Sequence, residues 1–115
     1  MPILFWSHVT NYWVLIWMVV DSGADYTILP LRYAHELGID LSRDTDEQST
    51  GGIGGKTRVH LIKKLWQVRL GDWERQIPFG ILDNNDIPPL LGRQGFLETF
   101  KVTFHKHVTI FFEDK

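Results

Sequence analysis

The chain has 115 residues, a net charge of −2 at pH 7 and no cysteine. This length predicts a single domain over residues 1–115 with one modest core, so an active site that needs two lobes requires a second chain. The near-neutral charge offers no basic surface for nucleic acid. The lack of cysteine excludes disulfides, thiolate nucleophiles and cysteine-based zinc sites, and nothing argues for an oxidising compartment.

The one strongly apolar segment, residues 12–20, ends at Asp21 and is too short to span a membrane. The first basic residue is Arg32, so the amino end lacks the basic leader of a signal peptide. We therefore expect a cytoplasmic protein without a membrane partner. Because β-branched and aromatic side chains dominate this segment, it predicts a strand that is buried on both faces.

The amino-terminal part predicts a hairpin, a short strand and a helix. In chain order these are a strand over residues 3–7, a turn over 8–11, the apolar strand over 12–20, a short strand over 26–29 and a helix over 31–37. The helix is predicted because Leu31, Ala34 and Leu37 recur at helical spacing between Pro30 and Gly38, residues that favour its start and its end.

The rest of the chain predicts further hairpins. Residues 40–50 are polar and predict a solvated connection, and the glycine cluster at 51–55 predicts a flexible hairpin tip. The remaining predicted elements are strands over residues 56–70, 73–82 and 90–91, a short helix over 93–100 and a closing hairpin over 101–112. The predicted fold class is therefore all-β with one or two short helices.

Asp21 is the first candidate for a catalytic residue. An acidic residue directly after an apolar strand costs folding free energy unless it is hydrogen-bonded or serves a function. The segment Asp21-Ser22-Gly23-Ala24 taken alone could simply open a turn. Two further features follow it in order: the glycine cluster some thirty residues downstream, and an apolar-apolar-Gly-Arg segment at residues 90–93. The chain length adds a third, since it allows one half of a two-carboxylate site and not both halves.

With these features in this order, the chain resembles the retroviral-type aspartic proteases, or retropepsins, and their stand-alone cellular and bacterial relatives. In that family a strand of the type VVDSGADYTILP carries the catalytic aspartate, a glycine-rich flap follows, and an apolar-apolar-Gly-Arg segment precedes the carboxyl-terminal helix. The resemblance runs from about residue 3 to residue 112. It implies an all-β, retropepsin-like closed barrel with a flap hairpin, assembled as a homodimer.

The activity that the resemblance implies is a homodimeric aspartic endopeptidase that hydrolyses polypeptides without a cofactor. The Asp21 carboxylates of two subunits would meet at a two-fold axis. One carboxylate would keep a proton and polarise the scissile carbonyl, while the other would take a proton from the attacking water. We expect a bell-shaped pH profile with its maximum at roughly pH 4 to 6.

The resemblance also implies roles for individual residues. The catalytic group would be Asp21, Ser22 and Gly23, with the Ser22 hydroxyl bonding the loop of the neighbouring subunit and the Gly23 N–H bonding the carboxylate. The substrate-binding residues would be Ala24, Asp25, Gly52, Ile53, Gly54, Leu90 and Leu91. Arg93 would give structural support by pairing with Asp25, although Asp25 could instead be a surface acid. Leu90 and Leu91 could equally belong to the core.

Several alternatives stay open. The same fold could serve as a catalytically silent peptide-binding or dimerisation module, and the domain could be excised from a longer chain. Gln94 and Gly95 depart from the viral pattern, so the terminal helix is expected to begin more loosely. His105 and His107 have a spacing compatible with metal binding, but no third ligand is evident, and no metal is expected.

Overall fold

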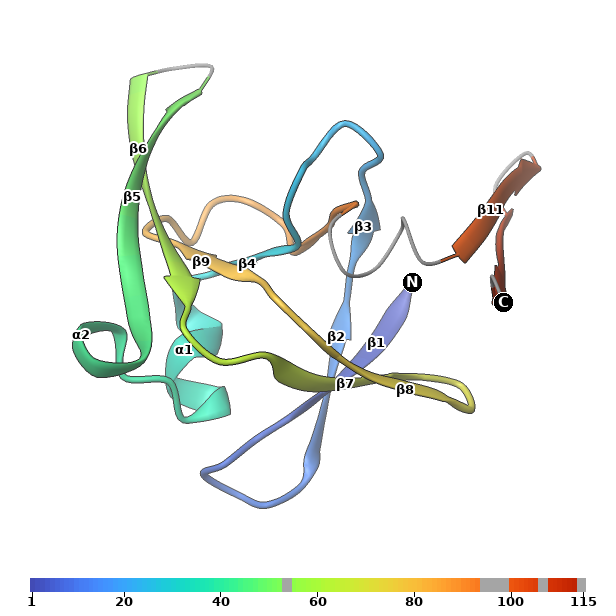
Figure 1. The fold of residues 1–115 in the computed structure, drawn as a ribbon, viewed down its shortest axis with the longest axis horizontal. Helices are drawn as coiled ribbons and strands as arrows, with labels where there is room; N and C mark the ends of the chain where they lie inside the picture. The colour runs from blue at the N-terminus through green and yellow to red at the C-terminus, as the bar shows by residue number, and fades with distance from the viewer. Residues whose placement is uncertain (53–54, 94–99, 106–107, 114–115) are drawn as a thin grey trace.

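The computed structural model describes residues 1–52, 55–93, 100–105 and 108–113, which form mostly β-structure with two short helices (Figure 1). The strands are β1 (Pro2–Trp6), β2 (Trp13–Trp17), β3 (Val19–Val20), β4 (Ile28–Pro30), β5 (Thr45–Gly52), β6 (Gly55–Ile62), β7 (Trp66–Leu70), β8 (Trp73–Ile77), β9 (Gly80–Leu82), β10 (Leu90–Leu91), β11 (Phe100–His105) and β12 (Val108–Glu113). The helices are α1 (Arg32–Leu37) and α2 (Leu41–Asp44). Neither these helices nor any other segment of the described ranges forms a helix that could cross a membrane.

The strands form three sheets. The first has the order β2-β1-β7-β8, the second has the order β3-β10-β4-β9-β6-β5, and the third contains β11 and β12 alone. The chain passes from the first sheet to the second at Met18, between β2 and β3. The expected closed barrel is not formed within the described ranges, where each sheet keeps two edges.

One hydrophobic core joins the two larger sheets and α1. Phe5 of β1 and Phe79, just before β9, are at most 1% exposed, and their rings meet edge to face with centroids 5.5 Å apart. Leu37 supplies the inner side of α1 and Leu91 the inner side of β10. Since β10 belongs to this core, the carboxyl-terminal segment that it begins is anchored beside β3.

The nine-residue apolar segment ahead of the first aspartate is not buried on both faces, so that prediction was wrong. Ile16 and Met18 are buried, whereas Leu15, Trp17 and Val19 are 53%, 66% and 50% exposed. The reason is that successive side chains of a strand point to opposite faces, and only the face that carries Ile16 and Met18 packs against the core. An unbroken apolar sequence does not distinguish burial on one face from burial on two.

Three other predictions on the element boundaries were wrong. The polar residues 40–50 contain α2 and most of β5 instead of a connection. The predicted strand over 56–70 divides into β6 and β7, and the one over 73–82 divides into β8 and β9, with the two parts in different sheets. In the β5–β6 hairpin the pairing is made by the backbone while the described β5 side chains after Thr45 are exposed, so the sequence carries no alternation of apolar residues to reveal it.

Apart from the terminal helix, the other predicted elements are present. Hairpin β1–β2 pairs Ile3 with Ile16, and the closing hairpin pairs β11 with β12. Helix α1 ends at Gly38, whose φ of 80° lies in the left-handed region that glycine favours. The predicted terminal helix falls mostly on residues 94–99, which include Gln94 and Gly95 and lie outside the described residues.

Candidate active site

Asp21 stands at the end of β3, where the second sheet holds it through backbone hydrogen bonds. Strand β3 runs parallel to β10. The Val19 N–H donates to the Pro89 carbonyl at 2.8 Å, and the Asp21 N–H donates to the Leu91 carbonyl at 3.0 Å. A segment from late in the chain therefore fixes the backbone on both sides of Val20.

The turn after Asp21 orients its carboxylate. The Gly23 N–H donates to Asp21 Oδ1 at 3.0 Å, and the Ala24 N–H donates to the Asp21 carbonyl at 3.1 Å. A Cβ on Gly23 would lie 3.3 Å from Oδ1, so a side chain there would crowd the carboxylate. In the described part of the chain, Asp21 Oδ2 accepts no hydrogen bond. One carboxylate oxygen is thus oriented and the other is open.

The structure brings Asp25 and Arg93 together as an ion pair between Asp25 Oδ1 and Arg93 Nη2. The Arg93 N–H also donates to the Ala24 carbonyl at 3.0 Å. Both side chains are more than half exposed, at 54% for Arg93 and 62% for Asp25, so the pair adds little stability. Its effect is to tie the Asp21 loop to the segment that follows β10.

Thr27 is a positioning residue that the sequence did not reveal. Its side chain is fully buried, and its Oγ1 accepts a hydrogen bond of 3.1 Å from the Gly92 N–H. A Cβ on Gly92 would overlap the Tyr26 carbonyl and come within 2.8 Å of the Thr27 nitrogen. The backbone at Gly92 passes so close to Tyr26 and Thr27 that only a residue without a side chain fits there. The Thr27 hydroxyl supplies the acceptor for the Gly92 N–H. The available signal was a hydroxyl residue at the start of an apolar strand.

The remaining predicted site residues lie around this crossing. Leu91 is fully buried in the core, and Leu90 is half-buried beside it. Ala24 is half-buried. Ser22 is exposed, and its hydroxyl makes no hydrogen bond within the described residues. Of the two leucines, only Leu90 thus has a side chain that a substrate could reach.

The predicted flap is the β5–β6 hairpin, which projects from the body of the protein (Figure 1). Its strands are antiparallel, and Gly52 at the end of β5 pairs with Gly55 at the start of β6. Ile53 and Gly54, also predicted for the flap, lie outside the described residues. Strand β6 pairs with β9, so the hairpin extends the same sheet that holds β3 and β10.

No group of three or more histidine, cysteine, aspartate or glutamate side chains that could hold a metal ion occurs in the described ranges. His107, one of the two spaced histidines, lies outside those ranges, and the His105 side chain is not described.

Comparison with known proteins identifies the family. The model of the aspartyl protease family matches residues 14–94, well over half of the chain, so the chain belongs to that family. No significant match was found among curated protein sequences.

Two solved structures show the same fold. A retropepsin-like aspartic protease from Rickettsia conorii is 23% identical, with a TM-score of 0.70 over 96% of this chain and 98% of that one. EIAV protease in complex with the inhibitor HBY-793 is 18% identical, with a TM-score of 0.54 over 81% of this chain and 79% of that one. The retropepsin-like fold expected from the sequence is thereby confirmed.

Proposed function

We propose that this chain is a homodimeric aspartic endopeptidase in which the Asp21 residues of two subunits form one active site. Membership of the aspartyl protease family supports proteolysis in general. The observation that carries the finer proposal is the state of the Asp21 carboxylate. It has one oxygen held by the Gly23 N–H and one open oxygen, and no other side chain in the described residues is hydrogen-bonded to it. A single carboxylate held in this way can serve as one half of a two-acid site, and the aspartyl protease family supports that role.

Two such carboxylates can perform peptide hydrolysis without a cofactor. Held close together, they bind one proton between them, because two neighbouring negative charges repel. The ionised Asp21 takes a proton from a water molecule as the water oxygen attacks the scissile carbonyl carbon. The protonated Asp21 gives its proton to the carbonyl oxygen. The tetrahedral intermediate then collapses and the C–N bond breaks. The amine nitrogen receives the proton that came from water, and one hydroxyl of the intermediate returns its proton to the other Asp21 as the product carbonyl forms.

The surface around Asp21 supports a second subunit. Leu15, Trp17 and Val19 lie on the strand segment that leads to the loop, and each is at least half exposed. The exposed Ser22 hydroxyl lacks a partner within the described chain, so in a dimer it would be free to bond the loop of the neighbouring copy. A two-fold arrangement would place both copies of these groups in one interface.

An extended polypeptide fits the site. The β5–β6 hairpin would cover a bound peptide strand, and backbone hydrogen bonds would hold the peptide with little dependence on its sequence. The half-buried Leu90 offers an apolar contact beside the scissile bond. An apolar subsite of this kind discriminates weakly between aliphatic side chains, so we propose broad apolar specificity.

Cleavage of a diverse peptide mixture at mildly acidic pH tests the proposal. We compare wild type with Asp21→Asn and with Asp72→Asn, a matched change in the exposed turn between β7 and β8. Loss of the acid–base pair should lower the cleavage rate by about 10²- to 10⁴-fold in Asp21→Asn, while Asp72→Asn cuts like wild type. Equal cleavage by all three proteins would contradict the role of Asp21. A folded wild-type dimer that cuts nothing would instead be a silent peptide-binding module.

A further inference from the structure

A pocket lies where the β5–β6 hairpin leaves the body of the protein, away from the Asp21 loop. It has a volume of about 300 Å³. Its wall comes from the β1–β2 turn, from α2, and from the turn between β6 and β7, through His8, Arg43, Asp44, Lys63, Lys64 and Trp66. None of these residues belongs to the active-site loop or to the glycine cluster of the flap. We propose that this pocket binds a phosphate monoester that carries a small apolar group.

The pocket is built into the fold by hydrogen bonds between its walls. The Lys63 N–H donates to the Asp44 carbonyl at 2.8 Å, and the His8 N–H donates to the Leu37 carbonyl at 3.1 Å. The Trp66 indole Nε1–H donates to the Trp6 carbonyl at 2.7 Å. The rings of His8 and Trp66 meet edge to face with centroids 4.8 Å apart. Segments distant in sequence are thus fixed around a space that exists before a ligand enters.

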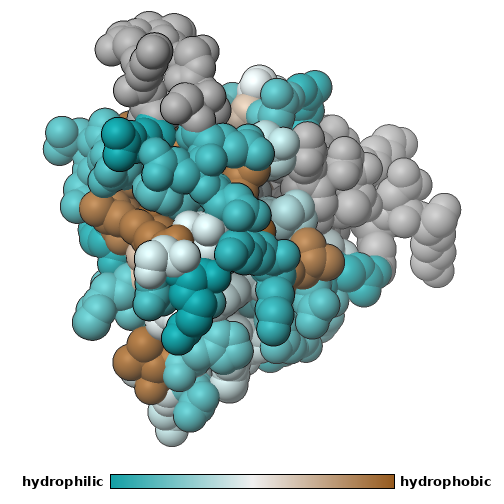
Figure 2. Space-filling view, turned by 60° about the vertical axis from the view of Figure 1, so that its left-hand side comes forward, coloured by the Kyte–Doolittle hydropathy of each residue, from teal (hydrophilic) through white to brown (hydrophobic). Residues whose placement is uncertain are grey.

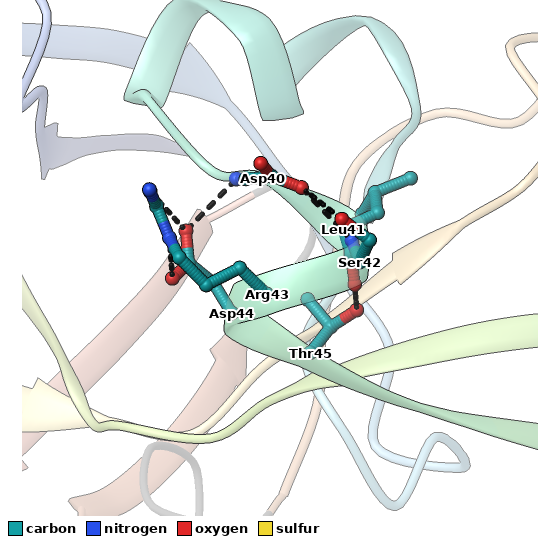
Figure 3. A network of polar contacts seen from close by, with 6 residues as sticks. All are labelled: Asp40, Leu41, Ser42, Arg43, Asp44 and Thr45. Atoms are coloured by element: carbon teal, nitrogen blue, oxygen red, sulfur yellow. Dashed lines mark hydrogen bonds and ion pairs between the residues drawn. The ribbon is translucent and has the colours of Figure 1, made fainter.

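The charge of the pocket is positive although the whole chain carries −2. Asp44 is the only acid among the described lining residues, and both of its carboxylate oxygens accept hydrogen bonds. Its Oδ1 accepts from Arg43 Nε at 3.0 Å, and its Oδ2 accepts from Arg43 Nη2 at 3.2 Å and from the Asp40 N–H at 2.9 Å (Figure 3). Neither Lys63 nor Lys64 has a salt-bridge partner in the described ranges. Besides the Arg43 guanidinium, the charge of Lys63 also helps to lower the pKa of Asp44, but neither ammonium group is held in an ion pair within those ranges, so both can approach an anion.

The donor set favours phosphate over carboxylate. The planar guanidinium of Arg43, which would grip a carboxylate with two parallel bonds, already holds Asp44 in that way. The two lysines act as point charges, and a phosphate monoester has three oxygens and close to two negative charges to share between them. The surrounding face, which carries α2 and the β5–β6 hairpin, is largely hydrophilic (Figure 2).

The apolar side of the pocket favours an organic ester over the free ion. Ile62 at the end of β6 and Trp66 at the start of β7 line the cavity. The space of about 300 Å³ accommodates a phosphate together with a single ring. Because Thr45 at the start of β5 pairs with Ile62, the ligand would sit where the two flap strands leave the body.

Titration of the full chain with phenyl phosphate, followed by calorimetry and by amide and indole NMR signals, tests the proposal. We expect binding that shifts the His8 and Trp66 signals. The double variant Lys63→Gln/Lys64→Gln should raise Kd at least tenfold. The control Arg75→Gln, which removes a positive charge from the exposed β8 surface, should leave Kd within about twofold of wild type. Spectra of the free variants establish that each is folded.

Three comparisons with other probes decide the ligand class. Phenol and benzoate should each bind at least tenfold more weakly than phenyl phosphate, and so should inorganic phosphate. The proposal is overturned if phenyl phosphate does not bind or if the double variant binds it as wild type does. It is also overturned if any of the three other probes binds equally well. Equal binding of phenol would show that the phosphate contributes nothing, equal binding of benzoate that phosphate is not preferred over carboxylate, and equal binding of inorganic phosphate that the apolar group contributes nothing.

Discussion

Two segments of this chain each carry a pair of aspartates four residues apart, at residues 21–25 and 40–44, and the structure holds the two pairs in different ways. In the second segment both carboxylates are engaged locally. Asp40 Oδ1 accepts from the N–H and the hydroxyl of Ser42, and Asp44 pairs with Arg43 (Figure 3). These bonds lower the pKa of both carboxyls, that of Asp40 through Ser42 and that of Asp44 through the Arg43 guanidinium. Asp40 thus caps the start of α2, and Asp44 accepts the Asp40 N–H just before β5 of the hairpin begins.

In the first segment one side-chain partner comes from far along the chain, and Asp21 Oδ2 accepts no hydrogen bond within the described residues. Asp25 pairs with Arg93, 68 residues later, and Asp21 uses one oxygen to accept from Gly23. A carboxylate that is oriented but not fully engaged stays available for a substrate, a water molecule or a second carboxylate. The two segments therefore differ in where the partners of their acids lie: Asp40 and Asp44 are held within residues 40–44, whereas the Asp21–Asp25 loop is tied to Arg93 and to Leu91.

The largest expected effect is on the free energy of unfolding. It comes from a change at Gly92, which packs against the backbone of the first segment, and it leaves both acids in place. Gly92→Ala should destabilise the fold by about 3 kcal/mol, because the new Cβ would overlap the Tyr26 carbonyl. Gly71→Ala is the matched control. It has a φ of 57° but no atom within 4 Å of the added Cβ, and it should cost about 1 kcal/mol. Urea unfolding of both variants measures the difference, and equal losses would contradict the close crossing at Gly92.

Thr27→Val should cost about 2 kcal/mol, because it leaves the buried Gly92 N–H without its acceptor. Thr27→Ser keeps the hydroxyl and should lose less stability than Thr27→Val. Urea unfolding separates the two variants. If serine and valine destabilise equally, the hydroxyl does not support the crossing and its role is packing alone.

Arg93→Gln tests the long-range ion pair. Its exposed pair with Asp25 adds little stability, so the unfolding midpoint should barely change, whereas peptide cleavage should fall about tenfold because the Asp21 loop loses its tether. Arg43→Gln breaks the corresponding pair of the second segment and should leave cleavage unchanged. If both variants lose peptide cleavage equally, the ion pair of the first segment has no special role in holding the Asp21 loop.

The smallest effect concerns acid stability. The folded-state pKa values of Asp40 and Asp44 lie below the ordinary value of 3.8, so their ionised forms stabilise the fold above that pH. This contribution is lost as the pH falls through the folded-state values. Asp40→Asn/Asp44→Asn should therefore show a shallower loss of stability than wild type between about pH 5 and pH 3. The control Asp72→Asn/Asp83→Asn, which changes two exposed loop acids, should follow the wild-type curve.

The sequence predicted best those features that local chemistry encodes. A few neighbouring residues are enough to recognise Asp21 at the end of an apolar strand, and Pro30 and Gly38 at the two ends of α1. The β5–β6 hairpin was located only by its glycines, because its pairing is made by backbone groups between polar strands. The exposure of Trp17 and the buried role of Thr27 depend on which segments lie beside them, and a sequence pattern carries no such information.

The claim that each chain supplies half of one active site has a direct test in mixed dimers. Wild type and Asp21→Asn are mixed in equal amounts, unfolded in urea and refolded together, and cleavage is compared with the same total amount of refolded wild type. If both Asp21 carboxylates are needed, random pairing leaves about a quarter of the activity, since only dimers of two wild-type subunits can cut. Retention of half of the activity would show that each chain cuts independently, and would contradict the shared site.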